Sequence, residues 1–234
     1  MKGKIGIIAA MEEELDAIKI RMTNIIEEHI YELKFYKGEI SNIECIVVKS
    51  GVGKVNAART AQILISNYNV DKVINVGSAG ALNDELKIGD IIIGEELTQY
   101  DFDITAFGHE KGYITDVGKI MYSDKKLIKI CETIIENMNN NDEFNLFMGK
   151  IATGDMFCTD MKMKQYIRNE FNADCIEMEG AAIAQVCKLD DIDCLVIRAI
   201  SDVPNGKNEI DFDEYLKMAS ERCGIIIQKM CMLM

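Results

Sequence analysis

Two short stretches near the C-terminus constrain the fold more than any other part of the sequence. Cys175–Ala182 reads Cys-Ile-Glu-Met-Glu-Gly-Ala-Ala, and Val196–Asp202 reads Val-Ile-Arg-Ala-Ile-Ser-Asp. Each stretch begins with apolar, strand-like residues and carries clustered charge. Since a solvated surface needs no apolar approach, we expect these charges at the ends of buried strands. In an α/β sheet, ligands bind at the carboxyl ends of the strands.

Strand-like and helix-like patterns alternate along the whole chain. Strands are predicted at Lys4–Ala10, Ile30–Lys37, Ile43–Ser50, Asp71–Val76, Asp90–Glu95, Leu146–Ala152, Cys175–Met178 and Cys194–Ile200. Helices are predicted at Glu12–Met22, Gly53–Tyr68, Ser123–Met138, Met161–Phe171, Glu179–Lys188 and Phe212–Met234, with a loop at 139–142. No Pro-rich or Ser-rich linker divides these segments. The pattern therefore predicts one α/β domain over residues 1–234, with helices on both faces of a sheet.

The composition argues against several classes of partner. A net charge of −13 disfavours nucleic acid and anionic membranes. No apolar stretch is long enough for a transmembrane helix, and the N-terminus does not resemble a signal peptide. Because the eight cysteines include no C-x-x-C pair, we expect reduced thiols in a cytoplasmic protein. With only two histidines, no His-rich metal site is available, and acid–base chemistry must use carboxylates.

Three motifs follow predicted strands in the first half of the chain. Glu12-Glu13-Glu14 opens a helix, where carboxylates are ordinary, although one of them could turn toward a pocket. Gly51-Val52-Gly53-Lys54 and Gly77-Ser78-Ala79-Gly80 are expected at turns, where glycines let a ligand approach backbone N–H groups. Neither is a P-loop or a G-x-G-x-x-G motif, so tight turns without a ligand remain the simpler interpretation.

The second half adds an aromatic residue and four charges. Phe157, within Gly154-Asp155-Met156-Phe157-Cys158, is either a core residue or a stacking platform for a base. Glu177 and Glu179 share one face of an extended strand unless that strand end is simply solvated. Arg198 and Asp202 end the next strand, and a structural ion pair is the alternative to a ligand site.

Seven motifs in this order resemble one known family. They are Ala10-Met11-Glu12-Glu13-Glu14, Ser50-Gly51-Val52-Gly53-Lys54, Gly77-Ser78-Ala79-Gly80, Thr105-Ala106-Phe107-Gly108, Gly154-Asp155-Met156-Phe157, Glu177-Met178-Glu179 and Arg198-Ala199-Ile200-Ser201-Asp202. Together they resemble the 5′-methylthioadenosine/S-adenosylhomocysteine nucleosidases of the purine nucleoside phosphorylase superfamily, from Lys4 to about Leu216. The resemblance implies a three-layer α/β/α sandwich with a central mixed sheet. It also implies a homodimer that hydrolyses the N-glycosidic bond of these nucleosides, and of 5′-deoxyadenosine, without cofactor or metal.

The resemblance also implies the catalytic roles. Glu14 matches the base that activates water, and Asp202 matches the acid that protonates adenine N7. An acid is needed because adenine leaves poorly as an anion. A free aspartic acid has a pKa of about 3.9, so we expect burial or a neighbouring carboxylate to help Asp202 hold a proton.

The remaining assignments concern substrate binding. Ser78 and Arg198 match groups near the water and the ribose, and Met178 and Glu179 match the ribose contacts. The same resemblance adds to the substrate-binding set Ala79, Gly80, Glu177 and Ser201.

The adenine and the 5′ substituent have their own matches. Phe157 matches the stacking aromatic, and Cys158 matches the position whose backbone holds the adenine edge. An apolar pocket for the 5′-alkylthio group is matched by Met11, Val52 and Phe212, and by Phe107 from the second subunit.

Three other functions are weighed against this one. A phosphorylase of the same superfamily needs fixed cations for phosphate, whereas this chain has five arginines and carries Asn75 where purine phosphorylases place one. A nucleosidase for aminodeoxyfutalosine would share every residue named. A non-catalytic nucleoside-binding protein could drop Glu14 or Asp202, and both are present.

Overall fold

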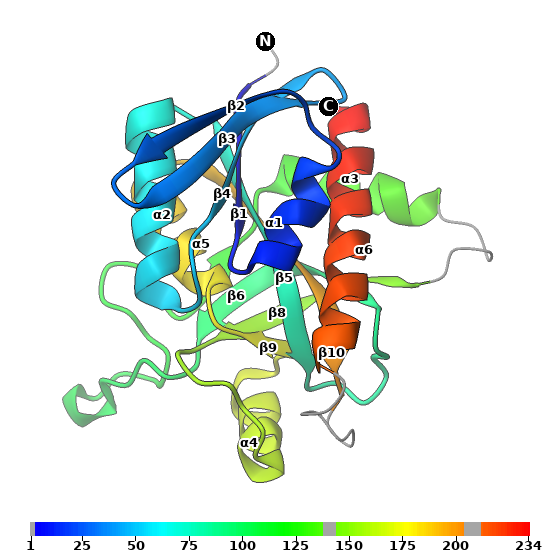
Figure 1. The fold of residues 1–234 in the computed structure, drawn as a ribbon. Helices are drawn as coiled ribbons and strands as arrows, with labels where there is room; N and C mark the ends of the chain where they lie inside the picture. The colour runs from blue at the N-terminus through cyan, green and yellow to red at the C-terminus, as the bar shows by residue number, and fades with distance from the viewer. Residues whose placement is uncertain (1–2, 138–143, 204–211) are drawn as a thin grey trace.

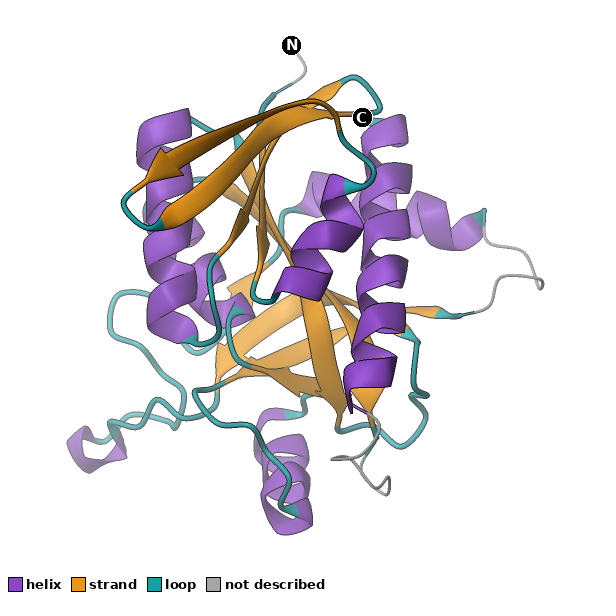
Figure 2. Ribbon diagram, viewed as in Figure 1, coloured by secondary structure: helices purple, strands orange, loops and turns teal. Residues whose placement is uncertain are grey.

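The computed structural model describes residues 3–137, 144–203 and 212–234. In this part of the chain, ten strands form one mixed sheet with helices on both sides (Figures 1 and 2). The strands are β1 (Ile5–Ala9), β2 (Thr23–Ile30), β3 (Leu33–Ile40), β4 (Ile43–Lys49), β5 (Lys72–Ala81), β6 (Ile91–Gln99), β7 (Met121–Tyr122), β8 (Leu146–Thr153), β9 (Cys175–Glu177) and β10 (Asp193–Asp202). The helices are α1 (Glu12–Lys19), α2 (Lys54–Tyr68), the short 3₁₀ helix η1 (Thr105–Phe107), α3 (Lys125–Glu136), α4 (Met161–Phe171), α5 (Gly180–Leu189) and α6 (Phe212–Leu233).

Two hydrophobic cores lie on opposite faces of the sheet. One includes Leu64 of α2 and Ile183 of α5, and the other includes Leu15 of α1, Cys131 of α3 and Ile226 of α6. Figure 1 shows α2 and α5 on one side of the sheet and α1, α3 and α6 on the other. Every residue of β1 is buried, as expected for a parallel strand that is covered on both faces. The predicted three-layer arrangement is therefore confirmed.

The pairing of β5 with three other strands brings several strand ends together. β5 runs parallel to β1 and to β10, while β9 pairs with its end in the antiparallel direction. β10 also pairs with β6, and β6 leads through β8 and β9 back to β5, so these five strands close into a ring. The carboxyl ends of β1, β5, β9 and β10 consequently meet at one edge of the sheet.

The register between β10 and β5 decides which side chains face each other across that edge. Arg198 lies opposite Gly77, and Asp202 lies opposite Gly80 after an irregularity that follows Ile200. A Cβ atom on Gly77 would lie 2.9 Å from the Arg198 guanidinium, and one on Gly80 would lie 2.9 Å from the Asp202 carboxylate. Both glycines therefore allow the charged side chains to approach the strand.

That arrangement corrects one expectation. Gly77-Ser78-Ala79-Gly80 lies inside β5 and does not form a turn, whereas Gly51 and Gly53 do occupy a turn, with φ of 83° and 100°. The sequence pattern resembles a turn because glycine also serves where another side chain must come close to a strand.

The sequence analysis did not predict two of the strands, β2 and β7. The predicted strand Ile30–Lys37 covers the end of β2 and most of β3, which form a hairpin. β2 is an edge strand whose residues are almost all exposed, so it lacks the alternation of apolar and polar residues on which the prediction relies. β7 has only two residues. The predicted loop 139–142 lies outside the described residues.

Close packing between α1 and α6 holds α1 against the sheet. A Cβ atom on Gly224 of α6 would lie 2.7 Å from the carbonyl oxygen of Ala17 in α1 and 2.6 Å from the Arg21 guanidinium. Arg21 in turn donates to the Ala17 carbonyl oxygen and pairs with Glu221. Since α1 carries Glu14, this contact helps to fix the position of that carboxylate.

Gly224→Ala should destabilise the protein although alanine is the better helix former by about 1 kcal/mol. The added methyl group meets backbone atoms of α1, and such overpacking typically costs about 1–3 kcal/mol. Urea denaturation would measure the loss. Met232→Ala, at an exposed position of the same helix, is the control and should change the free energy of unfolding by less than about 0.5 kcal/mol. A Gly224→Ala variant as stable as the wild type would contradict this account of α1–α6 packing.

Candidate functional site

A cavity of about 330 Å³ opens at the edge where the strand ends meet. Its lining comes from the ends of β1, β5, β9 and β10, from the start of α1 and from two loops. The predicted site residues that line it are Met11, Glu14, Val52, Ser78, Ala79, Gly80, Phe157, Glu177, Met178, Glu179, Ser201 and Asp202, joined by Ala10 and Ile176. The tertiary structure thus gathers motifs that are far apart in sequence around a single space.

Glu14 is the one member of the acidic triplet that turns into the cavity, since Glu12 and Glu13 are exposed. Its Oε2 accepts hydrogen bonds from the backbone N–H groups of Ala10 (2.8 Å) and Met11 (3.0 Å), which caps the start of α1. Its Oε1 accepts from the backbone N–H of Ser78 at 3.0 Å. The carboxylate is therefore fixed from two sides, and both expected roles, helix capping and facing a pocket, apply to this residue.

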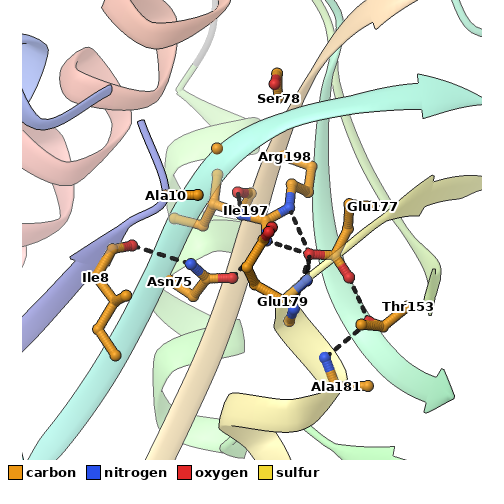
Figure 3. A network of polar contacts seen from close by, with 12 residues as sticks. Ile8, Ala10, Asn75, Ser78, Thr153, Glu177, Glu179, Ala181, Ile197 and Arg198 are labelled. Carbon is orange, nitrogen blue, oxygen red and sulfur yellow. Dashed lines mark hydrogen bonds and ion pairs between the residues drawn. The ribbon is translucent and has the colours of Figure 1, made fainter. Parts of the chain in front are cut away.

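A buried polar network lies behind the cavity and centres on Arg198 (Figure 3). The guanidinium donates through Nε and Nη2 to Glu177, and through Nη2 to the Asn75 side chain. It also forms an ion pair with Glu179 at 3.6 Å. Burial alone would lower the pKa of Arg198, but the Glu177 and Glu179 carboxylates raise it, so the guanidinium stays charged. Arg198 does not line the cavity itself; it holds the residues that do.

Glu177 joins this network to α5. Its carboxylate accepts from the backbone N–H groups of Glu179 (2.9 Å) and Gly180 (2.7 Å), at the N-terminus of the helix. Thr153 donates its hydroxyl to Glu177 and accepts from the Ala181 N–H at 2.8 Å. Glu177 is thus buried and fully engaged, which excludes the alternative of a solvated strand end.

Glu179 is the more unusual of the two glutamates. Its Oε1 accepts from the Gly53 N–H at 2.8 Å, which ties the glycine turn to the cavity. Burial, together with the neighbouring Glu177 carboxylate, raises the pKa of Glu179 to about 7. Near neutral pH this group therefore exchanges between a neutral and a charged form, and a bound ligand with hydroxyl donors or positive charge would favour the charged one.

Asp202 has a partner that the sequence analysis did not predict. Lys164 of α4 donates to its Oδ2 at 2.8 Å, and both side chains are buried, with 3% and 9% of their surfaces exposed. Of the two alternatives expected for Asp202, burial is found, whereas its charged neighbour is an ammonium group and not a carboxylate. Arg198 and Asp202 both take part in buried ion pairs, the alternative left open for them, but each has a different partner. Helical spacing placed Lys164 with buried Ile167 and Phe171, and this was the only available signal.

The residues at the cavity mouth match their predicted places in part. Phe157 is about half exposed and lines the main cavity, so it is not a core residue. Cys158 lies beside a smaller adjoining cavity of about 40 Å³. Burial raises the pKa of the Cys158 thiol, and the nearby Lys164 charge acts in the opposite direction. A neutral thiol is a poor nucleophile, which disfavours a covalent role for this cysteine.

Phe107, like Arg198 and Cys158, does not line the main cavity. Phe107, on η1, is 81% exposed, and the segment that carries it extends away from the sheet at the lower left of Figures 1 and 2. Phe212 is the first residue of α6, but its side chain lies outside the described residues.

Two further observations concern ligands and surroundings. In the described ranges no group of three or more His, Cys, Asp or Glu side chains could hold a metal ion. Within the same ranges none of the helices has the length and apolar character required to cross a bilayer.

Comparison with known proteins gives consistent results. A model of the phosphorylase superfamily matches residues 4–231. The chain is 38% identical over 227 residues to 5′-methylthioadenosine/S-adenosylhomocysteine nucleosidase of Staphylococcus haemolyticus, covering 97% of this chain and 98% of the relative. The structure of the Colwellia psychrerythraea nucleosidase of that name, in complex with adenine, is similar with a TM-score of 0.93 and 34% identity over 99% of this chain and 95% of that one. Futalosine hydrolase of Helicobacter pylori is similar with a TM-score of 0.91 and 32% identity, over 98% and 97% of the two chains.

Glu179→Gln should become more stable relative to the wild type as the pH rises. Folded Glu179 keeps its proton up to about pH 7, whereas the unfolded chain releases it near 4.5. Between these values the unfolded state binds fewer protons, so the free energy of unfolding of the wild type falls with rising pH. Glutamine does not titrate. The difference in the free energy of unfolding between the variant and the wild type should therefore shift in favour of the variant by about 1–3 kcal/mol between about pH 5 and about pH 8.

Urea denaturation of both proteins at the two pH values measures this difference. Glu170→Gln, at an exposed position, is the control for the loss of one carboxylate and should leave the difference almost constant. A constant difference for Glu179→Gln would mean that Glu179 is already ionised at the lower pH in the folded state.

Proposed function

Since this chain belongs to the phosphorylase superfamily and, within it, to the 5′-methylthioadenosine/S-adenosylhomocysteine nucleosidases, we propose that it hydrolyses the N-glycosidic bond of these two nucleosides. The products are adenine and the corresponding thioribose. The observation that carries the proposal is the presence of two fixed carboxylates, Glu14 and Asp202, in the wall of one cavity.

The positions of these carboxylates suit an acid and a base. Glu14 Oε1 lies 3.0 Å from the Cβ position of Gly77, and Asp202 lies 2.9 Å from that of Gly80. Both carboxylates line one cavity of about 330 Å³, which leaves room for a ribose and a water molecule between them. In this mechanism Glu14 activates the water, Asp202 delivers a proton to N7 of the departing adenine, and C1′ inverts.

The charge of the cavity supports a cationic transition state. Among the described residues its wall carries four carboxylates, Glu14, Glu177, Glu179 and Asp202, and no lysine or arginine. A ribosyl group gains positive charge as the bond to adenine breaks, and fixed negative charge stabilises it. Glu179, held by the Gly53 N–H, is placed to accept hydrogen bonds from the ribose hydroxyls.

The same charge disfavours phosphate as the attacking group. Phosphate binding requires cations with free donors. Arg198 is the arginine nearest to the cavity, and its donors go to Glu177, to Asn75 and to the Ile197 carbonyl oxygen at 3.4 Å. Water is therefore the nucleophile in this proposal, and phosphorolysis is disfavoured.

The apolar part of the cavity suits the rest of the substrate. Phe157 offers a face for adenine, with the Cys158 backbone at the adenine edge, while Ser78, Ala79, Met178 and Ser201 border the ribose and its water. The 5′-alkylthio group is assigned to Met11, Val52 and Phe212.

A homodimer would complete this pocket. Lys54 bridges Asp101 and Asp155 through bonds of 2.6 and 2.8 Å, so the glycine turn, the segment before η1 and the loop before Phe157 form one assembly at the cavity mouth. Val55 and Phe107, beside these tethered residues, are each about 80% exposed. Exposed apolar side chains of this kind favour an interface between subunits, with Phe107 reaching the partner's 5′ pocket.

The proposal has a wider scope than these two substrates. It includes 5′-deoxyadenosine as a substrate and roles in methionine salvage and in removal of methyl-transfer products. It also places the protein in the cytoplasm, in keeping with eight free cysteines, and treats residues 1–234 as a single domain.

The first prediction concerns the products and the two carboxylates. Adenine and methylthioribose should appear from methylthioadenosine in phosphate-free buffer. Glu14→Gln and Asp202→Asn should each lower kcat by about 10²–10⁴-fold in variants that circular dichroism shows to be folded at the assay temperature. Glu13→Gln, at the exposed neighbouring position, is the control and should keep full activity.

Chromatography of the products decides between the candidate functions. Methylthioribose-1-phosphate, formed only when phosphate is added, would indicate a phosphorylase. Turnover of aminodeoxyfutalosine alone would identify the narrower activity suggested by the similarity to futalosine hydrolase. Adenine binding without turnover of any of these nucleosides would indicate a binding protein.

Phe107→Asp should weaken both self-association and the binding of alkylthio nucleosides, because it places a charge in the expected interface. Analytical ultracentrifugation measures the first effect, and the KM for methylthioadenosine measures the second. Met232→Asp introduces the same charge at an exposed position near the C-terminus, at the opposite end of the molecule in Figure 1. This control should remain dimeric, and a fully active monomeric wild type would refute the dimer proposal.

A further inference from the structure

The buried pair between Lys164 and Asp202 is a strong interaction at the cavity that the proposed mechanism leaves unused. Lys164 lies on the face of α4 that also carries Ile167 and Phe171, and its side chain is 3% exposed. Fully buried lysines are rare unless they are paired. The ammonium group has one acidic partner given by the structure, Asp202 Oδ2 at 2.8 Å. The ammonium group therefore lies in a buried, apolar region and pairs with the residue proposed as the acid.

This pair raises a chemical question about that acid. A general acid must carry a proton when the leaving group departs. The Lys164 nitrogen and an Asp202 oxygen lie 2.8 Å apart, and since an amine is far more basic than a carboxylate, we place the proton between them on nitrogen. Asp202 then begins the reaction as a carboxylate without a proton of its own. The Ser201 hydroxyl also donates to Asp202, at 3.4 Å, but it is a far weaker acid than an ammonium.

We propose that Lys164 is the source of the proton that Asp202 passes to N7 of the departing adenine. The inference rests on the function proposed above and deepens it. Lys164 is a positioning residue in this scheme, because it acts through Asp202 and does not touch the substrate. Gly80 contributes by leaving the Asp202 carboxylate free to lie against β5 between the ammonium and the cavity.

The step balances in protons and electrons. As the C1′–N9 bond breaks and its electron pair moves into the purine, an N–H bond of Lys164 breaks and an O–H bond forms on Asp202. That O–H bond then breaks as N7 takes the proton, so Asp202 ends as a carboxylate beside a neutral amine. Water attacks C1′ and gives its proton to Glu14. After the products leave, Lys164 regains a proton from solvent and Glu14 releases one, so no further reactant is needed.

The position of the pair supports this direction of transfer. Asp202 lines both the main cavity and the small cavity beside Phe157 and Cys158, whereas Lys164 lines neither. The carboxylate therefore lies between the ammonium and the space assigned to adenine. A lysine that served only to neutralise Asp202 would oppose protonation of the acid and slow the reaction.

Two variants separate proton supply from simple positioning. Lys164→Met removes the charge and the proton. Lys164→Arg keeps a positive charge and N–H donors but holds its protons too tightly to release them. On methylthioadenosine, both variants should lose about 10²–10⁴-fold in kcat. Lys162→Met, at an exposed position of the same helix, is the matched control and should retain wild-type activity.

A second substrate shows whether the loss concerns the leaving group. A 5-methylthioriboside of 4-nitrophenol releases a stable phenolate that needs no protonation. Both Lys164 variants, and Asp202→Asn, should hydrolyse it within about tenfold of the wild-type rate. Thermal unfolding and adenine binding, measured by calorimetry, check that each variant is folded with an intact pocket.

The possible results of these experiments distinguish proton supply by Lys164 from a purely structural role. Near-normal turnover of methylthioadenosine by Lys164→Arg would overturn the inference, because charge and position would then suffice. Equal losses on both substrates would also overturn it, because the pair would then be structural. Should Lys164→Met fail to fold, the Lys164→Arg variant decides alone. Failure of the proposed function itself would appear separately, as a wild-type protein that releases no adenine from any nucleoside tested.

Discussion

The buried guanidinium of Arg198 is the interaction on which the rest of the site depends. It lies on β10, donates to Glu177 at the end of β9 and to Asn75 on β5, and attracts Glu179 at the start of α5. A buried charge is costly unless its partners satisfy it, so these elements must meet in one arrangement. Such a network contributes more to the specificity of the fold than to its net stability. Here it fixes the register in which Arg198 lies over Gly77.

The cavity carries more negative charge than its cations balance. Arg198 faces three buried glutamates, and burial together with the neighbouring Glu177 carboxylate raises the pKa of Glu179. For the free protein this is a cost, because like charges in a poorly solvated space repel each other. For a reaction that creates positive charge on a sugar, the same excess stabilises the transition state without rearrangement of the protein. Stability and activity therefore place opposite demands on these residues.

Small residues and helix starts give the functional side chains their positions. Gly77 and Gly80 let two charged groups lie against β5, where any larger residue would collide with them. Glu14 caps α1 with one carboxylate oxygen and keeps the other at the cavity, near the Ser78 N–H. Each contact serves the fold and the site together. Glu14 is held by backbone N–H groups, whereas Asp202 is held by the Lys164 side chain.

Much of this protein was determined by local sequence. Fully apolar strands such as β1 and amphipathic helices such as α3 follow from periodicity, because each must bury one face or both. The clustering of Glu177, Glu179, Arg198 and Asp202 at strand ends could also be predicted. The exposed edge strand β2 could not, because its pattern lacks apolar alternation.

Only the tertiary structure determined which charged side chains pair with each other. The sequence indicated that Arg198 and Asp202 need partners, but it left those partners open. The parallel pairing of β10 with β5 and the position of α4 pair Arg198 with the glutamates and Asp202 with Lys164. Local patterns specify which face each segment buries. The packing of those faces then determines which residues distant in sequence come into contact. Lys164 lies 38 residues from Asp202, and nothing in a one-dimensional pattern brings them together.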